Sequence, residues 1–389
     1  MTGRHDDETA CWCALNRIFG FEPKAGHALV EQAGSASGVF GMDEEQLGEI
    51  LGPFSRFRSG IREEAVRQSK EELLRLEASG CRFLAFSDSA YPSLLKECED
   101  PPMGLYYMGV SDPGEIFGNP VSISMVGTRD ISPYGEEWCR RIVYALARSG
   151  VRPTVVSGLA LGTDICVHRA ALDAGLPTIA VMATGIDGVY PYRHIADARR
   201  IASAPGCALV TDYPPGTVPV KINFLRRNRI IAGMSMATLL TESRVKGGGM
   251  MTANLAFSYG REVYALPGRI DDTRSQGCNM LIHNHIAEPI SDLEEFGRDI
   301  GVQLGVRRNR SPEQRVRLTF GDRLSTEKQD KMISLLEKIR QNRGMMPEEL
   351  ATVCGTGIGE TTELCCLMEA EGLVSSDLLR RYSYRSESM

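Results

Sequence analysis

Four basic side chains lie within nine residues near the middle of the chain, in the segment 221–235 with the sequence KINFLRRNRIIAGMS. These are Lys221, Arg226, Arg227 and Arg229. No acidic residue lies among them, and the residues that follow, 230–240, are mostly apolar. Cations at the edge of a buried segment can bind an anion such as a phosphate. A solvated surface turn would have the same composition, so the choice depends on the rest of the chain.

Small residues with a basic neighbour also follow several short apolar runs. The groups are Gly127-Thr128-Arg129, Ser157-Gly158, Gly185 with Arg193 beyond it, Lys246 before three glycines, and Gly268-Arg269. Glycine lets a phosphate approach backbone N–H groups, and the N-terminus of a following helix adds positive charge, so we predict a phosphate-binding site. The Gly-x-Gly-x-x-Gly and Gly-x-x-x-x-Gly-Lys-Ser/Thr motifs are both missing, which argues against NAD and ATP, and we expect no cofactor.

These groups need a scaffold that brings them together, and the apolar runs indicate its type. The predicted strands are 82–86, 121–126, 154–157, 178–182, 208–211, 238–241 and 263–266, with helices at 135–149 and 162–174 among them. This alternation predicts an α/β fold with a mostly parallel sheet that helices cover on both faces. Ligands of such sheets bind at the carboxyl ends of the strands, which is where the small and basic residues lie.

Residues 1–80 are predicted to form a separate helical domain, because apolar residues recur with helical spacing around Trp12 and Leu29. Residues 18–25 are similar to the turn of a helix-hairpin-helix (SAM-like) domain, in which two glycines approach a DNA phosphate. Glu22 occupies the second glycine position, and its carboxylate would repel phosphate. We therefore expect a structural domain that has lost this DNA contact.

The C-terminal part is predicted to consist of a basic linker, 296–321, and a winged-helix domain, 322–389. We expect the linker to be flexible and to provide auxiliary phosphate contacts. Its basic residues are Arg307, Arg308, Arg310, Arg315 and Arg317. The helix at the recognition position, 361–370, has glutamates and no Lys or Arg, which disfavours duplex DNA and favours protein interaction. The wing is an exception, with the basic residues Arg380, Arg381 and Arg385.

The length of 389 residues suggests two or three domains. The net charge of −6 argues against a general nucleic-acid coat but is compatible with a local basic groove. No run of 18 apolar residues occurs and the N-terminus is polar, so we expect a cytoplasmic protein without membrane contact. The 11 cysteines form no Cys-x-x-Cys pair, which argues against a metal site and a disulfide framework.

Seven sequence motifs occur in a fixed order between residues 80 and 292. They are Val126-Gly127-Thr128-Arg129, 156–160 with Gly162-Thr163-Asp164, Gly185-Ile186-Asp187 with Tyr190-Pro191, 227–233, 246–253, 260–263 with Pro267-Gly268, and 277–282. This series resembles that of DNA-processing protein A, the DprA/Smf family. The chain departs from many family members at 247–251 and at 283–285. Seven ordered motifs are more specific than any single Gly-rich loop.

The resemblance implies an extended Rossmann-like, doubly wound domain that binds single-stranded DNA and forms a homodimer. It also implies that the protein protects incoming DNA and loads the recombinase RecA during natural transformation and homologous recombination. The family's arginine in the first motif contacts DNA phosphate, which assigns this role to Arg129, and Arg193 and Lys221 are expected in the same pocket. The other candidate DNA-binding residues are Gly127, Thr128, Ser157, Gly158, Arg226, Arg227, Asn228, Arg229, Lys246, Gly268 and Asn279. Asn228 and Arg229 adjoin buried residues, so we expect them chiefly to hold a loop in shape.

Aromatic residues that could stack on bases are few in this region. Tyr190, Tyr192 and Phe224 are the nearest to the predicted cations. They are equally compatible with base stacking and with a packing role in the core or a turn.

An alternative function is that of a nucleotide-processing enzyme of the phosphoribohydrolase, lysine-decarboxylase-like type, which has a related Rossmann-like domain. Those enzymes carry Pro-Gly-Gly-x-Gly-Thr-x-x-Glu, in which the last glutamate does chemistry. The comparable segment here, 246–254, ends in Asn254, which cannot act as a general acid or base. We therefore expect a binding protein and no enzyme activity.

Overall fold

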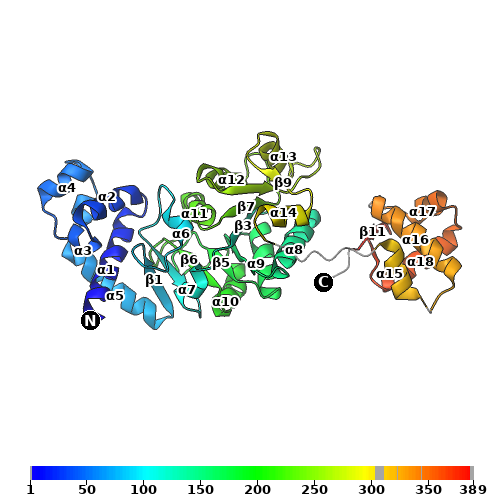
Figure 1. Ribbon diagram of the computed structural model, residues 1–389, viewed down its shortest axis with the longest axis horizontal. Helices are drawn as coiled ribbons and strands as arrows, with labels where there is room; N and C mark the ends of the chain where they lie inside the picture. The colour runs from blue at the N-terminus through cyan, green and yellow to red at the C-terminus, as the bar shows by residue number, and fades with distance from the viewer. Residues whose placement is uncertain (1, 303–310, 322, 343, 386–389) are drawn as a thin grey trace. The chain divides into compact units, whose positions relative to one another are not determined.

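The computed structural model describes residues 2–302, 311–321, 323–342 and 344–385. The chain divides into two compact units, Met1–Val306 and Arg307–Met389. The first unit contains the N-terminal helices and a large sheet, and the second contains four helices and a hairpin among the described residues (Figure 1). No helix in these ranges is long and apolar enough to cross a membrane.

A nine-stranded sheet forms the centre of the first unit, in the order β1-β2-β6-β5-β4-β3-β7-β8-β9. The strands are β1 (Cys81–Ala85), β2 (Gly104–Met108), β3 (Ser122–Val126), β4 (Thr154–Ser157), β5 (Thr178–Val181), β6 (Ala208–Thr211), β7 (Ala237–Leu240), β8 (Glu262–Ala265) and β9 (Glu288–Pro289). Strand β2 runs antiparallel to β1 and β6, and the other pairs are parallel. The prediction of a mostly parallel sheet is confirmed.

The strand order reverses at β3, which pairs with β4 on one side and with β7 on the other. The chain runs from β3 through β4 and β5 to β6 on one side and then crosses back to β7 on the other side of β3, so the loops after β3 and β7 lead away in opposite directions. Such a switch point leaves a crevice in which ligands of doubly wound sheets bind. The motif at Gly127 follows β3 directly and so lies at this point.

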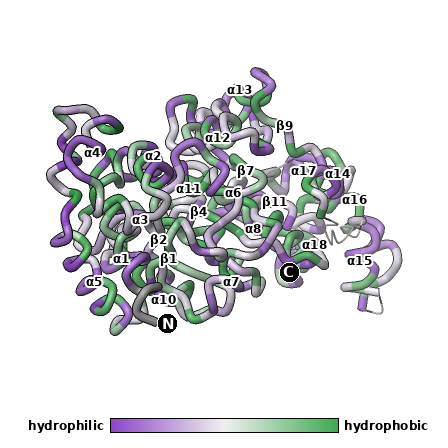
Figure 2. The backbone as a smooth tube through the Cα atoms, turned by 60° about the vertical axis from the view of Figure 1, so that its left-hand side comes forward, coloured by the Kyte–Doolittle hydropathy of each residue, from purple (hydrophilic) through white to green (hydrophobic). Residues whose placement is uncertain are grey.

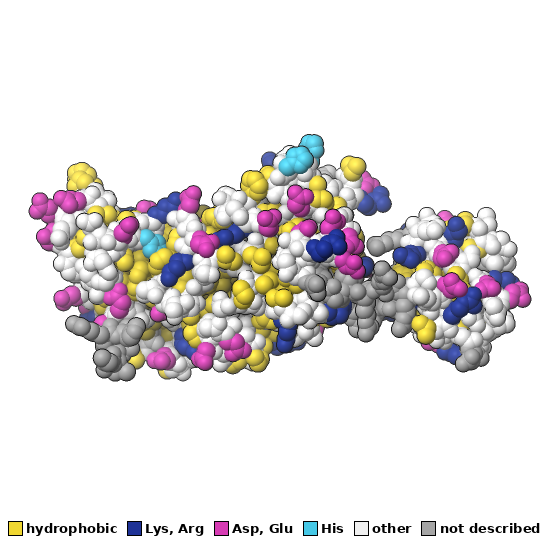
Figure 3. All heavy atoms as spheres, viewed as in Figure 1, with side chains coloured by type: hydrophobic (Ala, Val, Ile, Leu, Met, Phe, Trp, Pro, Cys, Tyr) yellow, Lys and Arg dark blue, Asp and Glu magenta, His cyan; other side chains and the backbone are white. Residues whose placement is uncertain are grey.

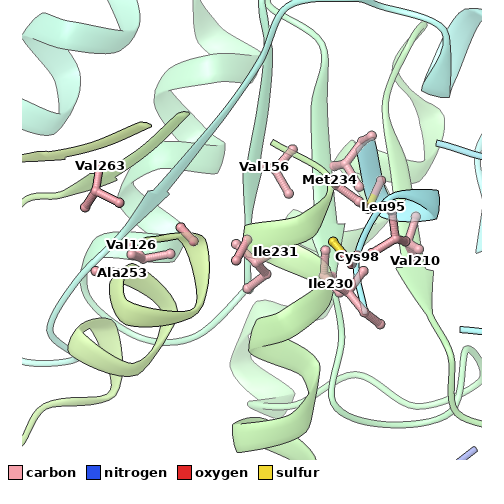
Figure 4. Close-up of a cluster of buried hydrophobic side chains, with 14 of the residues drawn as sticks. Leu95, Cys98, Val126, Val156, Val210, Ile230, Ile231, Met234, Ala253 and Val263 are labelled. Atoms are coloured by element: carbon pink, nitrogen blue, oxygen red, sulfur yellow. The ribbon is translucent and has the colours of Figure 1, made fainter. Parts of the chain in front are cut away.

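Helices cover both faces of the sheet (Figure 1). The principal ones are α8 (Pro133–Ala147), α9 (Thr163–Asp173), α10 (Ile195–Ser203), α11 (Lys221–Gly233), α12 (Gly248–Ser258), α13 (Gln276–His283) and α14 (Leu293–Asp299), with short α6 (Ser93–Lys96) and α7 (Pro113–Phe117). Alternate residues of β3 face opposite layers, since Val126 packs with α11 and α12 whereas Met125 packs with α8 and α9. Figure 4 shows Ile230, Ile231 and Ala253 meeting strand valines in the first of these layers.

Five helices precede the sheet, as predicted for an N-terminal helical domain. They are α1 (Thr2–Phe19), α2 (Pro23–Ala33), α3 (Ala36–Val39), α4 (Glu44–Leu51) and α5 (Glu63–Ala78), with a 3₁₀ turn η1 (Arg58–Gly60). Pro23 fits the first position of α2, where its missing N–H has no helical partner, and Asp43 forms a capping box with Gln46 at α4. Apolar residues lie on the inner sides of these helices, and outer turns such as those of α4 and α5 are largely hydrophilic (Figure 2).

The second unit has its own apolar core. Its elements are α15 (Pro312–Phe320), α16 (Thr326–Gln341), α17 (Pro347–Cys354), α18 (Ile358–Ala370) and a hairpin of β10 (Val374–Ser376) and β11 (Tyr382–Tyr384). Phe320, Leu336, Leu364 and Met368 are buried together. The helices followed by a small hairpin confirm the predicted winged-helix arrangement.

The segment predicted as a flexible linker is partly helical. Helix α14 ends inside it, and α15 belongs to the second unit, where the Arg315 side chain is buried and donates a hydrogen bond to the Arg385 carbonyl at 2.6 Å. The prediction was wrong here because the polar composition hides one apolar face, which Val316 and Phe320 supply. Three predicted phosphate contacts, Arg307, Arg308 and Arg310, lie outside the described residues.

Candidate nucleic-acid interface

The loop after β3 is held close to the start of α9. A Cβ atom on Gly127 would lie 2.4 Å from Thr163 Oγ1, so the position has no room for a side chain. The Thr128 carbonyl accepts a hydrogen bond from the Thr163 N–H at 3.1 Å, and the Thr128 hydroxyl accepts one from the Asp130 N–H at 3.1 Å. Gly127 and Thr128 therefore fix the course of the loop, and the next residue, Arg129, is exposed at the carboxyl edge.

Arg129 lies against an aromatic pair that sequence analysis left undecided between stacking and packing. Its guanidinium carbon lies 5.4 Å from the centre of the Phe224 ring, which is cation–π distance. The Tyr190 ring meets the Phe224 ring edge to face, with 5.5 Å between centres, and remains 48% exposed. Tyr192 is exposed nearby in the chain, within the 3₁₀ turn η2 (Tyr192–His194). The structure thus joins residues from the ends of β3 and β5 and from α11 in one cluster.

The segment that carries the basic cluster is a helix, and not the turn or loop considered from its charges. Helix α11 begins at Lys221, directly after the extended residue Val220, and no described side chain caps its first turn. Its first turn contains no acidic residue. The positive end of the helix dipole and the Lys221 ammonium therefore both favour an anion at this end of the helix.

Arg227 supports the loop that follows β4. Its side chain is buried, and it donates hydrogen bonds to the carbonyls of Gly158, at 2.6 Å, and Val181. A Cβ atom on Gly158 would lie 2.1 Å from the Arg227 guanidinium, which explains the glycine. Burial lowers the pKa of Arg227, and the Asp164 carboxyl beside it partly offsets this effect. Arg227 has no surface for a phosphate, in contrast to the contact expected from sequence.

Arg229 is also buried, and it joins α11 to two acidic residues. Its guanidinium lies 2.5 Å from the Asp212 carboxylate and 3.7 Å from that of Asp100, and it also binds the Asp100 carbonyl. The preceding residue, Asn228, is buried as well. Both residues therefore belong to the packing of α11, although they shape a helix and not the loop that we expected.

Arg226 contacts the N-terminal helical domain. It donates a hydrogen bond to the Gly20 carbonyl at 2.8 Å, and its guanidinium carbon lies 4.5 Å from the centre of the Phe21 ring. This contact was not predicted, because nothing in the sequence pairs residues about 200 positions apart. It places the turn between α1 and α2 against α11.

The remaining predicted cations are exposed. Arg193 lies on η2, Lys221 at the start of α11, and Lys246 in the loop before α12. Within the described part of the chain, neither these residues nor Arg129 form an ion pair. Their charges are therefore open to an external anion.

Several predicted site residues have packing roles. The Ser157 hydroxyl is buried and donates to the Met125 carbonyl at 2.7 Å. The Asn279 side chain bonds both the N–H of Gly268, at 3.2 Å, and its carbonyl, at 3.0 Å. A Cβ atom on Gly268 would lie 2.1 Å from the Ser275 hydroxyl oxygen. These residues hold the loops of the carboxyl edge and do not face outward.

Glu242, at the end of β7, was not assigned a role from sequence. It is buried, and its carboxylate accepts hydrogen bonds from the N–H of Ser132, at 2.9 Å, and from the Ser132 hydroxyl, at 2.5 Å. Both oxygens thus fix the N-terminus of α8. A buried acid immediately after a strand was the available signal for this role.

The segment that corresponds to the motif of the alternative enzyme carries Asn254 at the position of the catalytic glutamate. Asn254 lies on α12 and donates to the Met250 carbonyl one turn earlier, at 2.8 Å. Glu242 is the buried acid nearest in sequence to that segment, and Ser132 occupies both of its oxygens. Among the residues that the structure describes, no group of three or more His, Cys, Asp or Glu side chains could hold a metal ion.

A doubly wound sheet with exposed cations and aromatic rings at its carboxyl edge, followed by a winged-helix unit, places this chain among doubly wound α/β proteins with an appended winged-helix unit. Within that class, residues 82–301 match the model of the family described as DNA recombination-mediator protein A, and the chain belongs to this family. The prediction of membership in the DprA/Smf family is confirmed.

Relatives in this family are similar over much of their length. Protein Smf of Synechocystis is 32% identical over 98% of this chain and 100% of the relative. The putative DNA processing protein DprA of Mycobacterium tuberculosis is 33% identical over 77% of this chain and 78% of the relative. The similarity to Protein Smf therefore extends through both units.

Two solved structures are similar to this chain. DNA processing protein A of Streptococcus pneumoniae matches with a TM-score of 0.63 and 26% identity, over 74% of this chain and 95% of that one. DNA processing protein A of Helicobacter pylori matches with a TM-score of 0.50 and 27% identity, over 56% of this chain and 95% of that one. The Helicobacter pylori protein has a single-stranded DNA binding mode.

Proposed function

We propose that the carboxyl edge of the sheet binds single-stranded DNA and that the protein acts as a recombination mediator that loads RecA onto the bound strand. The observation that carries the proposal is the stack of Arg129 on Phe224 beside the half-exposed Tyr190. Membership in the DNA recombination-mediator protein A family supports it, as does the single-stranded DNA binding mode of the Helicobacter pylori relative.

The chemistry of this cluster fits a single strand better than a duplex. Aromatic rings can stack only on bases that are free of their neighbours, and stacking tolerates any base sequence. The guanidinium of Arg129 can bind a phosphate while Phe224 holds it in place. Lys221 and the positive end of the α11 dipole supply a second phosphate position one turn from Phe224.

The predicted biological roles complete the proposal. We infer that the protein protects incoming single strands and hands them to RecA during natural transformation and homologous recombination, and that it works as a homodimer in the cytoplasm. Membership in the DNA recombination-mediator protein A family supports the role in recombination. The proposal assigns no catalytic step, and release of a free base from a nucleotide by the purified protein would contradict this part.

A titration of the purified protein with a labelled oligothymidylate tests the binding site. We expect Arg129→Ala, Arg193→Ala and Lys221→Ala each to weaken binding about tenfold at low salt, because each removes one charged phosphate contact. Arg75→Ala is the matched control, since Arg75 is an exposed arginine on α5 whose partner is Glu71. Unchanged affinity in all three variants would contradict the site.

A further inference from the structure

The exposed part of α11 continues from the Arg129–Phe224 cluster toward the N-terminal domain. An α-helix turns by about 100° per residue, so the side chains of its first two turns follow one another around the axis in a fixed sequence. That sequence is Phe224, Lys221, Leu225, Ile222 and Arg226, and all five are exposed or partly exposed. A strand bound at Phe224 can therefore cross the start of α11 and reach Arg226.

Arg226 leads directly to a second aromatic ring. Its guanidinium lies 4.5 Å from the ring centre of Phe21 and is fixed by the Gly20 carbonyl. Phe21 is 50% exposed, so part of its ring remains open to a ligand. The arrangement repeats that of Arg129 on Phe224, with an arginine on an aromatic ring at each side of α11.

The acidic residue that seemed to exclude DNA from this turn is compensated. Glu22 forms an ion pair with Arg56, with 3.0 Å between nitrogen and oxygen. The same guanidinium lies 4.9 Å from the ring centre of Phe57, and Phe57 packs on Phe19 with 4.8 Å between rings. The loop after α4 thus brings a cation against the carboxylate whose repulsion was the reason to expect no DNA contact.

This loop also carries an aromatic side chain without any packing role. Phe54 is 98% exposed, two residues before Arg56. A fully exposed phenylalanine contributes nothing to the core and leaves apolar surface in water. Figure 3 shows that exposed hydrophobic side chains in the first unit lie among side chains of both charges.

We propose that the N-terminal helical domain is a second part of the single-strand site, in which Phe21 and Phe54 stack on bases and Arg226 binds the phosphate between the two parts of the site. Arg56 contributes by cancelling the charge of Glu22. The proposal rests on the proposed function of the Arg129–Phe224 cluster. It gives the strand a path from the switch point, over the start of α11, to the loop between α4 and α5.

The apolar residues beside this path suit bases as well. Val218, Val220 and Ile222 are all exposed, at alternate positions around Lys221. Apolar side chains on both sides of a cation let bases lie flat while the phosphates follow the charge. A duplex, whose bases are stacked inside, would gain nothing from these contacts.

Length-dependent binding by the full chain tests this proposal. The probes are oligothymidylates of about 6 and about 20 nucleotides, since sites for single strands range from roughly 4 to 16 nucleotides. We expect Phe21→Ala and Phe54→Ala each to weaken binding of the long strand about fivefold or more and to leave the short strand unchanged. Phe21→Trp should keep the affinity, and Leu74→Ala, at an exposed apolar residue on α5, is the control.

A charge cycle tests the role of Arg56. Arg56→Ala leaves Glu22 uncompensated, so we expect weaker binding of the long strand. The double variant Arg56→Ala/Glu22→Gln should recover most of the lost affinity. A double variant no better than Arg56→Ala alone would contradict the compensating role of Arg56.

The outcomes separate this proposal from the function on which it rests. If Phe21→Ala and Phe54→Ala bind both strands as the wild type does, the N-terminal part of the site is refuted while the Arg129–Phe224 cluster stands. If the wild type fails to bind the short strand, or Phe224→Ala binds it equally well, the proposed function itself is refuted. Phe54→Ala keeps the test valid should Phe21→Ala unfold, because Phe54 makes no packing contribution.

Discussion

Arg227 and Arg229 lie two positions apart on α11, and their different partners show how single residues divide the work of the basic cluster. Arg227 binds two loop carbonyls, whereas Arg229 binds the carboxylate of Asp212. Lys221 and Arg129 face outward instead. Charge alone could not separate these roles, because a buried arginine and an exposed one look alike in sequence.

Removal of the Arg229 side chain should cost stability more than affinity. Arg229→Ala leaves the buried Asp212 carboxylate without its cation, and breaking a buried ion pair in this way costs about 3–5 kcal/mol. Urea unfolding measures the loss. Affinity for the 6-nucleotide strand, corrected for the folded fraction, should stay within about twofold of the wild type. Equal stability together with lost binding would place Arg229 in the DNA site.

At the scale of elements, His168 connects α9 to the sheet. Its Nδ1 lies 2.8 Å from the Thr178 hydroxyl oxygen on β5, and that hydroxyl donates to the Val155 carbonyl on β4 at 2.8 Å. Because the Thr178 hydroxyl proton is donated to the Val155 carbonyl, the Nδ1 atom of His168 carries the ring proton and donates it to the Thr178 oxygen. The ring is buried, and burial, with a smaller effect of the Arg227 charge, lowers the pKa of His168 to about 3.

The depressed pKa makes stability depend on pH in a defined direction. Above pH 6.5 the His168 ring is neutral in both the folded and the unfolded protein. Between pH 6.5 and about 3 only the unfolded chain takes up a proton on this ring, so the free energy of unfolding decreases as the pH falls toward 3. Between pH 7 and pH 5 this group should remove about 2 kcal/mol from the free energy of unfolding. Urea unfolding at both pH values should show that His168→Gln loses less stability between pH 7 and pH 5 than the wild type does, by that amount. An equal loss of stability in the two proteins would contradict a neutral buried ring.

The strands of the sheet were predictable, whereas helix α11 was not. Strands such as β4 and β6 are short, apolar runs, and burial on both faces of a parallel sheet requires that composition. Helix α11 buries Asn223 and two arginines on its inner side, so its hydrophobic pattern does not have helical spacing. The residues that satisfy the two arginines come from the end of β5 and from the loops after β4 and β6, which no local pattern reveals.

The same limit applies to the candidate site. Motif order predicted Arg129 and Lys221, and the structure leaves both exposed at one edge. The contribution of Phe21 could not be predicted, because it depends on a domain contact through Arg226. Glu22 led us to expect that the N-terminal domain had lost its DNA contact, because its carboxylate would repel phosphate. Arg56 forms an ion pair with this carboxylate and offsets the repulsion.

On the scale of the whole molecule, the two units carry different surfaces. The first unit holds the exposed cations of the carboxyl edge. In the second unit, α18 presents acids at the recognition position, where Glu360 pairs with Lys331 and Glu363 pairs with Lys328, at 2.8 and 3.0 Å. Helix α18 itself carries no Lys or Arg that could bind a DNA phosphate.

A chain that ends at Val306 should therefore fold and bind DNA. The first unit contains its own core and all the residues of the proposed site, and a compact unit of this kind can fold by itself. We expect its affinity for the 6-nucleotide strand to lie within about twofold of that of the full chain. Circular dichroism and anisotropy measure fold and affinity, and a folded but inactive shortened chain would show that the second unit supplies part of the site.

The salt dependence of single-strand affinity tests the central claim most directly. For the 6-nucleotide strand, Arg129, Arg193, Lys221 and Lys246 should give a slope of log K against log salt of about −3 for wild type, since each phosphate contact to a single strand contributes about −0.7. Arg129→Ala should reduce the slope to about −2, whereas Phe224→Ala should lower affinity about fivefold or more at an unchanged slope. A slope near zero for wild type, or equal slopes and affinities in all three proteins, would contradict a phosphate and base site at the Arg129–Phe224 cluster.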